Sequence, residues 1–350
     1  MCSSDLGGLR HRLGRGGPVS EQSRIIVISD SLHDLPEAVS ALDASRHHVT
    51  YVPSLTPWAE LAPDHRRMLA EARAVVMGRV LGIDTAALAL APRLCVIALH
   101  TSGSDNVDMD EASRRGVLVT NCKGVNAEQC AEFAMGLMLC VVRKILIGDH
   151  AIRAVKWAAL TQSSMDLYGA TMGVIGLGRI ARAFVTRARA FGMRILVHTR
   201  TPDLGLAGQG GIEYVTLDEL LGQADVVGLF ASLHKGSRHM IGAREFSLMK
   251  RSAYFINIAR GELVDEAALV DALRSGAIAG AGLDVFEEEP LLKSPLFDLD
   301  NVVLTPHQAG LTHGGKTGAA VRAARNALQA LDGAVPADAV NPSAWPSRSI

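Results

Sequence analysis

Short runs of consecutive apolar residues recur along the chain and predict strands that are buried on both faces. In the first third of the sequence these runs occupy residues 24–29, 48–52, 74–77 and 94–99. Helical patterns separate them, at residues 35–42, 59–72 and 85–91. Strands of this kind, alternating with helices, are typical of a parallel sheet with helices on both sides, so this segment is predicted to be an α/β unit.

The same alternation begins again in the second half of the chain. A long helix is predicted at residues 127–147, and its polar beginning resembles a capping box. Predicted strands then follow at residues 171–175, 193–198, 226–230, 253–258, 280–285 and 302–304, with helices between them. The fold class expected from the two segments is α/β, with two doubly wound parallel-sheet domains, Rossmann-like and flavodoxin-like.

A glycine-rich turn joins the strand predicted at residues 171–175 to the next helix. Its sequence is Gly176-Leu-Gly178-Arg179-Ile180-Ala181. Gly176 permits a turn that a side chain would block, and Gly178 allows a pyrophosphate to approach the backbone at the positive end of the helix. The strand, turn and helix together predict a dinucleotide site that includes Arg179 and Ile180.

The residues after the next strand bear on which dinucleotide is bound. In the dinucleotide fingerprint, an acid about 20 residues beyond the turn binds the ribose hydroxyls. Thr199 stands at that position and is followed by Arg200 and Thr201. Because a carboxylate would repel a 2′-phosphate whereas an arginine and two hydroxyls can bind one, the sequence favours NADP over NAD. The alternative is that Arg200 is solvated and Asp203 binds the ribose.

The composition limits the classes of function. The chain is 48% hydrophobic and 20% charged, with a formal net charge of −1. A nearly neutral chain offers no basic field for nucleic acid, and its longest apolar run, at residues 133–142, is too short to span a bilayer. The five cysteines include no Cys-x-x-Cys pair, so we expect reduced thiols in a cytoplasmic protein, without disulfides or a metal site.

Two polar loops follow strands of the first unit, at the sheet edge where parallel folds bind ligands. The first contains Gly78 and Arg79, and the second contains Ser102 and Gly103. The backbone N–H groups of the second loop are suited to hold a small carboxylate, and a turn selected only for its geometry is the alternative. Gly78 and Arg79 are predicted to line a substrate pocket. Arg79 indicates either a second anionic group on the substrate or a surface ion pair.

A length of 350 residues is typical of two domains, and the patterns give their limits. Residues 24–125 and 306–335 are predicted to form a discontinuous substrate domain, because a helix at residues 314–330 returns to it. The dinucleotide-binding domain is predicted at residues 126–305, with an active-site cleft between the two domains. Residues 1–23 lack periodicity and are expected to be disordered, and residues 336–350 are expected to form an extended tail.

Three charged residues follow predicted strands of the second unit. They are Arg260 in Ile-Asn-Ile-Ala-Arg-Gly-Glu, Glu289 in Leu-Asp-Val-Phe-Glu-Glu-Glu-Pro and His307 in Leu-Thr-Pro-His-Gln-Ala-Gly. The carboxyl ends of parallel strands meet at one edge of a sheet, so all three are expected to face the cofactor. Taken alone, His307 is equally well an ordinary loop histidine, and Glu289 a solvated surface residue.

Taken together, the motifs resemble those of a known enzyme family. The chain is similar to the D-isomer-specific 2-hydroxyacid dehydrogenases, which include phosphoglycerate dehydrogenase and glyoxylate/hydroxypyruvate reductase, in four motifs that occur in the family's order. These are Gly-Leu-Gly-Arg-Ile-Ala, Ile-Ala-Arg-Gly-Glu-Leu-Val-Asp-Glu, Gly-Ala-Gly-Leu-Asp-Val-Phe-Glu-Glu-Glu-Pro and Thr-Pro-His-Gln-Ala-Gly. The resemblance runs from about Arg24 to Pro342.

The resemblance implies roles for the charged residues. Arg260 would grip the substrate carboxylate and oxo group, His307 would be the acid/base, and Glu289 would orient the histidine and favour its charged form. Ser102 and Gly103 would hold the carboxylate through backbone donors. Further cofactor contacts are implied at Ser232, Ser237, Ile258 and, near the nicotinamide, Asp284. The family also implies a homodimer formed through the nucleotide domain.

The chain departs from the family pattern in two places. After the strand at residues 226–230 the family usually has Pro-Leu-Thr-x-x-Thr, and this chain has Ser232-Leu-His-Lys-Gly-Ser237. Without proline the loop is less stiff, which puts the cofactor contacts there in doubt, although Ser237 can still donate a hydrogen bond. The second departure is the missing acid at Thr199.

The predicted function follows from this chemistry. We expect an NAD(P)-dependent oxidoreductase that transfers a hydride between nicotinamide and a small 2-oxo or D-2-hydroxy acid, of the glyoxylate, hydroxypyruvate or phosphoglycerate type. Hydride addition places negative charge on the carbonyl oxygen, and a histidine beside a carboxylate can protonate that oxygen near neutral pH. A planar guanidinium matches the substrate carboxylate. The alternatives are a nucleotide-sensing co-regulator and a formate or phosphite dehydrogenase on the same scaffold.

Overall fold

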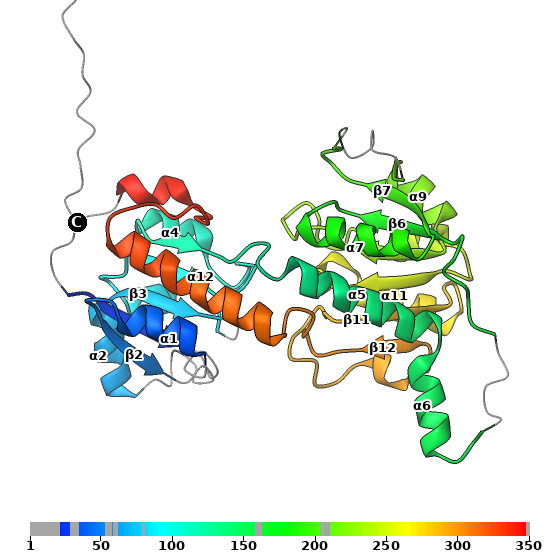
Figure 1. Ribbon diagram of the computed structural model, residues 1–350, viewed down its shortest axis with the longest axis horizontal. Helices are drawn as coiled ribbons and strands as arrows, with labels where there is room; N and C mark the ends of the chain where they lie inside the picture. The colour runs from blue at the N-terminus through cyan, green and yellow to red at the C-terminus, as the bar shows by residue number, and fades with distance from the viewer. Residues whose placement is uncertain are drawn as a thin grey trace, which may run out of the picture. The chain divides into compact units, whose positions relative to one another are not determined.

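The computed structural model describes residues 22–28, 35–52, 58, 62–78, 81–157, 163–203, 205 and 211–347. The chain falls into two compact units, Met1–Lys123 with Thr317–Ile350, and Gly124–Lys316. Each unit is an α/β structure built on one parallel sheet (Figure 1), which confirms the predicted fold class. Of the segment predicted to be disordered, residues 1–23, all but the last two residues lie outside the described residues.

The first unit contains a five-stranded sheet in the order β2-β1-β3-β4-β5. Its strands are β1 (Arg24–Ile28), β2 (His48–Val52), β3 (Ala72–Met77), β4 (Val96–Leu99) and β5 (Leu118–Thr120). The helices are α1 (Pro36–Asp43), α2 (Pro63–Glu71), α3 (Thr85–Ala89) and α4 (Met109–Arg114). This is the strand order of the flavodoxin-like doubly wound fold.

Burial and helix capping explain why these segments adopt their structures. Consecutive residues of β1 are buried, as expected for a strand that is covered on both faces. Asp84 precedes α3, and its carboxylate accepts a hydrogen bond from the backbone N–H of Ala87 at 2.8 Å. Such an N-cap satisfies an N–H group that has no partner within the helix, so it fixes where the helix begins.

The second unit contains a seven-stranded sheet in the order β12-β11-β10-β9-β6-β7-β8. Its strands are β6 (Thr171–Ile175), β7 (Arg194–His198), β8 (Glu213–Tyr214), β9 (Val226–Leu229), β10 (Tyr254–Asn257), β11 (Gly280–Leu283) and β12 (Val302–Leu304). Strands β6 to β11 follow the Rossmann order, and β12 extends the sheet beyond β11. The order reverses between β6 and β9, the point at which such sheets bind ligands.

Helices cover both faces of the second sheet. On one face α5 (Ala127–Val142) and α7 (Arg179–Ala190) lie side by side (Figure 1) and form an apolar core that includes Val174. The next strand residue, Ile175, belongs to a second core. Three helices contribute to that core: α9 (Leu217–Gln223), α10 (Ala243–Leu248) and α11 (Glu266–Arg274). Successive strand residues thus point into opposite cores, which is why the strand sequences are continuously apolar.

The long helix predicted at residues 127–147 is shorter in the structure. α5 ends at Val142, Lys144 adopts a left-handed φ of 55°, and a second helix, α6 (Ile145–Arg153), begins after it. Residues 148–170 were expected from the sequence to be irregular, and the part of them up to Arg153 is helical. None of the residues of α6 is buried, so its apolar side chains face outward.

The chain returns to the first unit later than predicted. The boundary lies at Thr317, within α12 (His313–Leu331), rather than at residue 306. The chain after β12 stays with the second unit because β12 pairs with β11 and because the Asp284 carboxylate accepts hydrogen bonds from the backbone N–H groups of Gln308 and Ala309, both at 2.9 Å. The other boundary lies at residues 123/124 rather than 125/126.

The prediction of an extended tail at residues 336–350 is wrong. Within the described part, Pro342–Ser347 form a 3-10 helix, and Asn341 is buried against β5. The Asn341 amide oxygen accepts from Val119 N at 2.7 Å, and its nitrogen donates to Val117 O at 3.0 Å. β5 is an edge strand whose outer backbone groups need partners, and the tail supplies them.

Replacing Asn341 with alanine is expected to destabilise the first unit. Two buried backbone groups of the edge strand would lose their partners, at a cost of about 2 kcal/mol or more in the free energy of unfolding. The measurement is urea unfolding of Asn341→Ala, followed by circular dichroism. Ser343→Ala, at a neighbouring exposed position, is the control. Equal midpoints for the two variants would contradict the structural role of Asn341.

Candidate active site

The glycine turn after β6 has the geometry that a dinucleotide requires. Gly176 has a φ of +88°, and a Cβ there would lie 2.8 Å from the Ala231 backbone. A Cβ at Gly178 would meet no atom within 4 Å, so open space adjoins the beginning of α7. Ala181 is fully buried, which permits close packing of helix on strand. These residues fit a pyrophosphate at the helix N-terminus.

The two residues after Gly178 face different surroundings. Ile180 packs against the apolar core beside α5. Arg179 lies against Gly124, where a Cβ would fall 2.5 Å from its Nη1. Gly124 also has a φ of +84°, so glycine is required there both by conformation and by the approach of the Arg179 side chain.

The end of β7 presents a cation and two hydroxyls. Arg200 and Thr201 are exposed and Thr199 is half-buried, and among the described residues no acidic group pairs with Arg200. Asp203, the alternative partner for a ribose, accepts a hydrogen bond from Arg182 Nη1 at 2.8 Å. Its carboxylate is thus engaged with α7, whereas Arg200 is available to an anion.

The loop after β9 closes on itself without proline. Ser237 is buried, its Oγ lies 3.0 Å from the carbonyl oxygen of Ser232, and it accepts from His234 N at 2.9 Å. The Ser237 hydroxyl therefore stiffens the loop, and Ser232 is the exposed member of the pair. Ile258, the other predicted cofactor contact after β10, lies in the apolar core.

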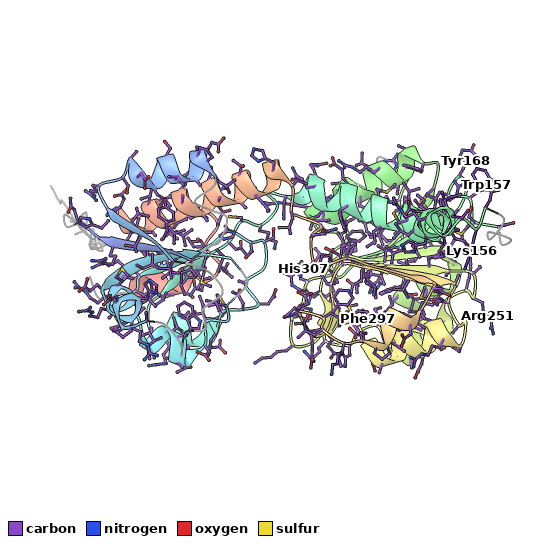
Figure 2. All side chains as sticks on the ribbon, turned by 90° about the horizontal axis from the view of Figure 1, so that it is seen from below. Lys156, Trp157, Tyr168, Arg251, Phe297 and His307 are labelled. Carbon is purple, nitrogen blue, oxygen red and sulfur yellow. The ribbon has the colours of Figure 1, made fainter. Side chains whose placement is uncertain are left out.

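Arg260, Glu289 and His307 follow three adjacent parallel strands. β10 pairs with β11 and β11 pairs with β12. The ladder continues beyond the strands, because Thr305 N donates to Leu283 O at 2.9 Å. The three loops therefore emerge at the same edge of one sheet. Figure 2 shows His307 at this edge, at the opposite end of the unit from Trp157 and Tyr168.

His307 and Glu289 are in direct contact. His307 Nδ1 lies 2.8 Å from Glu289 Oε2, and the other oxygen, Oε1, accepts from Phe286 N at 3.1 Å. The side chains are 33% and 19% exposed, so both are partly shielded while solvent still reaches the imidazole. A carboxylate can only accept, so this contact places a proton on Nδ1 and orients the ring.

Asp284 braces the loop that carries His307. Its side chain is fully buried, and its oxygens accept from Thr305 Oγ1 at 2.6 Å and from the backbone N–H groups of Gln308 and Ala309. The Asp284 carboxylate thus has hydrogen-bond partners within the protein itself. Its predicted contact with the nicotinamide stays a prediction.

Arg260 is held by a buried asparagine. Asn257 Nδ2 donates to Arg260 O at 3.0 Å, and Asn257 Oδ1 accepts from Ala259 N at 3.0 Å. Burial and the charge of Asp284 raise the pKa of the Cys130 thiol to about 11, while Arg260 lowers it. The charges of Asp284 and Arg260 thus both act on Cys130, in the first turn of α5. Asn257 was not among the residues predicted from the sequence, although a polar residue within an apolar strand was a usable signal.

The predicted substrate loops lie in the first unit. A Cβ at Gly78 would lie 2.9 Å from His100 Cε1, so the ring packs on the glycine, and burial lowers the pKa of His100. Ser102 O accepts from Asn121 Nδ2 at 3.0 Å, and Gly103 O accepts from Thr101 Oγ1 at 2.8 Å. Side chains thus brace the loop. Arg79 lies outside the described residues.

In the part of the chain that the structure describes, no helix is both long and apolar enough to cross a bilayer. No three or more His, Cys, Asp and Glu side chains among those residues form a group that could hold a metal ion.

Comparison with known families and structures agrees with this geometry. The model of the D-isomer specific 2-hydroxyacid dehydrogenase NAD binding domain matches residues 135–309. A solved structure of an NADPH-dependent glyoxylate/hydroxypyruvate reductase from Sinorhizobium meliloti, in complex with NADP and malonate, has a TM-score of 0.82 and 30% identity. The match covers 94% of this chain and 100% of that one.

Curated relatives extend the match into the first unit. Glyoxylate reductase of Thermococcus onnurineus is 44% identical over 266 residues, 74% of this chain and 80% of that protein. Glyoxylate reductase of Korarchaeum cryptofilum is 39% identical over 293 residues, 81% of this chain and 88% of that protein. With its Rossmann unit, its glycine turn and its histidine–glutamate pair, the chain belongs to the D-isomer specific 2-hydroxyacid dehydrogenases.

Proposed function

We propose that the protein reduces glyoxylate, hydroxypyruvate or a closely similar 2-oxo acid to the 2-hydroxy acid with NADPH. The observation that carries this proposal is the 2.8 Å contact between His307 and Glu289 at the sheet edge that Arg260 shares. An oriented imidazole suits protonation of a carbonyl oxygen, and a guanidinium suits a carboxylate. The relatives named glyoxylate reductase support the choice of substrate.

Each residue of the site has a defined task in this mechanism. The bound nicotinamide supplies the hydride. Arg260 binds the substrate carboxylate and orients the carbonyl carbon. Because Glu289 holds Nδ1 of His307, we assign Nε2 to the substrate, where it donates a proton to the oxygen that gains negative charge. Glu289 also stabilises the imidazolium from which that proton leaves.

Replacing His307 is expected to abolish most of the activity. General acid catalysis contributes about 100-fold or more, so His307→Gln should lower kcat by at least that factor. Turnover is measured as loss of NADPH absorbance with a panel of 2-oxo acids. His313→Gln, at an exposed position, is the control. NADPH binding, followed by fluorescence, should survive in both variants.

The same panel separates the alternatives. Absence of turnover with every 2-oxo acid, together with intact cofactor binding, would favour a nucleotide-sensing role. Reduction of NAD or NADP by formate or phosphite would instead identify a dehydrogenase of one of those acids. Near-wild-type turnover in His307→Gln would remove this residue from the mechanism.

The preference for NADP rests on Arg200. The guanidinium is exposed at the end of β7, where the family pattern places an acid that would repel a 2′-phosphate. Asp203 is turned to Arg182, so the nearby carboxylate is already paired. A cation flanked by the hydroxyls of Thr199 and Thr201 suits the additional phosphate.

Removing the Arg200 side chain is expected to weaken NADPH binding selectively. A hydrogen bond to a charged group contributes about 1.5–3 kcal/mol, so KM for NADPH should rise about tenfold or more in Arg200→Ala. KM for NADH should hardly change. Arg251→Ala, an exposed arginine at the end of the unit away from His307 (Figure 2), is the control. Equal changes for both cofactors would contradict a phosphate contact.

We further propose a homodimer formed through a surface of the second unit that includes α6, Val155, Trp157 and Tyr168. Ile152, Val155 and Trp157 are 52%, 91% and 88% exposed, and Tyr168 is 86% exposed. Figure 2 shows Trp157 and Tyr168 at the same end of their unit, away from His307. Large apolar side chains gathered on one surface are typical of an interface. A second copy bound there would leave the catalytic edge of this unit uncovered.

A charge in this surface is expected to dissociate the dimer. Ile152→Asp would bury a carboxylate in an apolar interface, where it costs several kcal/mol without a partner. Light scattering after gel filtration should show half the wild-type mass. Phe297→Asp, at another exposed apolar residue of the unit, is the control and should stay dimeric. A wild-type monomer at micromolar concentration would contradict the proposal.

We also propose that the protein works in the cytoplasm. Cys95, Cys122, Cys130 and Cys140 are all free thiols. Burial raises the pKa of Cys122 to about 12, which keeps this thiol protonated and unreactive. Unpaired cysteines of this kind are typical of a reducing compartment.

A further inference from the structure

The loops after β9, β10 and β11 meet at a side chain to which the mechanism above gives no task. This residue is Glu287, which precedes Glu289 by two positions in the same loop. Its Oε1 lies 2.5 Å from His239 Nε2 and accepts a hydrogen bond from Arg238 Nη2 at 3.1 Å. The Glu287 side chain is 27% exposed, so these contacts are partly shielded from water.

His239 and Arg238 end the loop that is predicted to contact the cofactor. They directly follow Ser237, whose hydroxyl closes that loop onto Ser232. His239 has a left-handed φ of 50°, which residues other than glycine rarely adopt. Its backbone N–H donates to Glu262 O at 2.9 Å. Both its backbone and its side chain are therefore fixed by the neighbouring loops.

The segment after Arg260 packs against the same place. A Cβ at Gly261 would overlap the carbonyl group of Phe286 and the nitrogen of Glu287, so the two backbones are in direct contact. Glu287 N also donates to Glu266 Oε2 at 3.2 Å, at the beginning of α11. Glu287 is thus held from its backbone by the Arg260 segment and from its side chain by the loop after β9.

Glu287 lies inside the turn that orients the Glu289 carboxylate. Phe286 N donates to Glu289 Oε1 at 3.1 Å, and Glu289 Oε2 contacts His307. This turn contains only residues 286–289, so a displacement of Glu287 displaces the Glu289 carboxylate as well. The histidine would then lose the geometry that fixes its proton.

We propose that Glu287 is a positioning residue that couples the loop after β9, the predicted cofactor loop, to the Glu289–His307 pair. Through His239 and Arg238 it holds the turn of residues 286–289 in the position that the loop after β9 adopts. When the bound dinucleotide orders the loop after β9, that loop then aligns His307, the acid that protonates the substrate. This inference rests on the proposed function, because it assigns a task within the same site.

The experiment compares Glu287→Ala with Glu288→Ala. Glu288 is an exposed neighbour, and none of the hydrogen bonds or ion pairs of the described residues involves its side chain. With turnover expressed per NADPH-binding site, Glu287→Ala should lower kcat about tenfold and leave KM for the 2-oxo acid nearly unchanged. A purely structural defect would reduce the number of binding sites without changing turnover at each site.

Two further variants test the coupling itself. Glu287→Gln keeps an acceptor for His239 and Arg238, so it should recover part of the lost kcat. His239→Asn tolerates the left-handed backbone and removes the ring. Added to Glu287→Ala, it should cause little further loss, because both changes break the same contact.

A spectroscopic measurement gives a result that does not require turnover. The Nδ1 proton of His307, observed by NMR in protein with isotope-labelled histidine and assigned with His307→Gln, should change in Glu287→Ala and persist in Glu288→Ala. An unchanged proton signal, unchanged kcat per site, or full additivity with His239→Asn would each overturn the inference. If the wild type reduces no 2-oxo acid but the proton signal responds as expected, the proposed function fails and the positioning role stands.

Discussion

Parallel pairing of β10, β11 and β12 is the constraint on which the site depends. It brings Arg260, Glu289 and His307, which are far apart in sequence, to one edge of a sheet. Asp284 locks this arrangement, because a fully buried carboxylate is costly unless its oxygens accept hydrogen bonds. Its backbone donors, Gln308 and Ala309, directly follow the histidine. The hydrogen bonds that satisfy the buried Asp284 carboxylate therefore also fix the backbone next to His307.

Much of the fold could be predicted because its signals are local. Continuous apolar runs predict strands that are covered on both faces, and the two cores on either side of β6 explain this pattern. The glycine turn could also be predicted from the local sequence, because the φ of Gly176 and the open space at Gly178 are properties of the turn itself. The common sheet edge of Arg260, Glu289 and His307 followed from their positions after strands, whereas their catalytic roles are implied by the family resemblance and stay a prediction.

Other features depend on contacts that no local pattern encodes. The three prolines at residues 336, 342 and 346 favoured an extended tail, but the edge of β5 offers hydrogen-bond partners that composition does not reveal. The boundary between the units lies within α12, later than predicted, because Asp284 holds the segment before this helix through Gln308 and Ala309. The contact between His239 and Glu287 joins residues 48 positions apart in sequence, and it became visible only when the loops were placed in three dimensions.

The glycine after Arg260 has a consequence for protein engineering. The backbone of residues 286–287 occupies the space that any Cβ at Gly261 would need. A mutant library that varies this position will mostly sample misfolded loops, whatever substrate it is screened against. Diversity is better directed to positions where an added Cβ meets no backbone atom, so that the turn of residues 286–289 keeps its place beside His307.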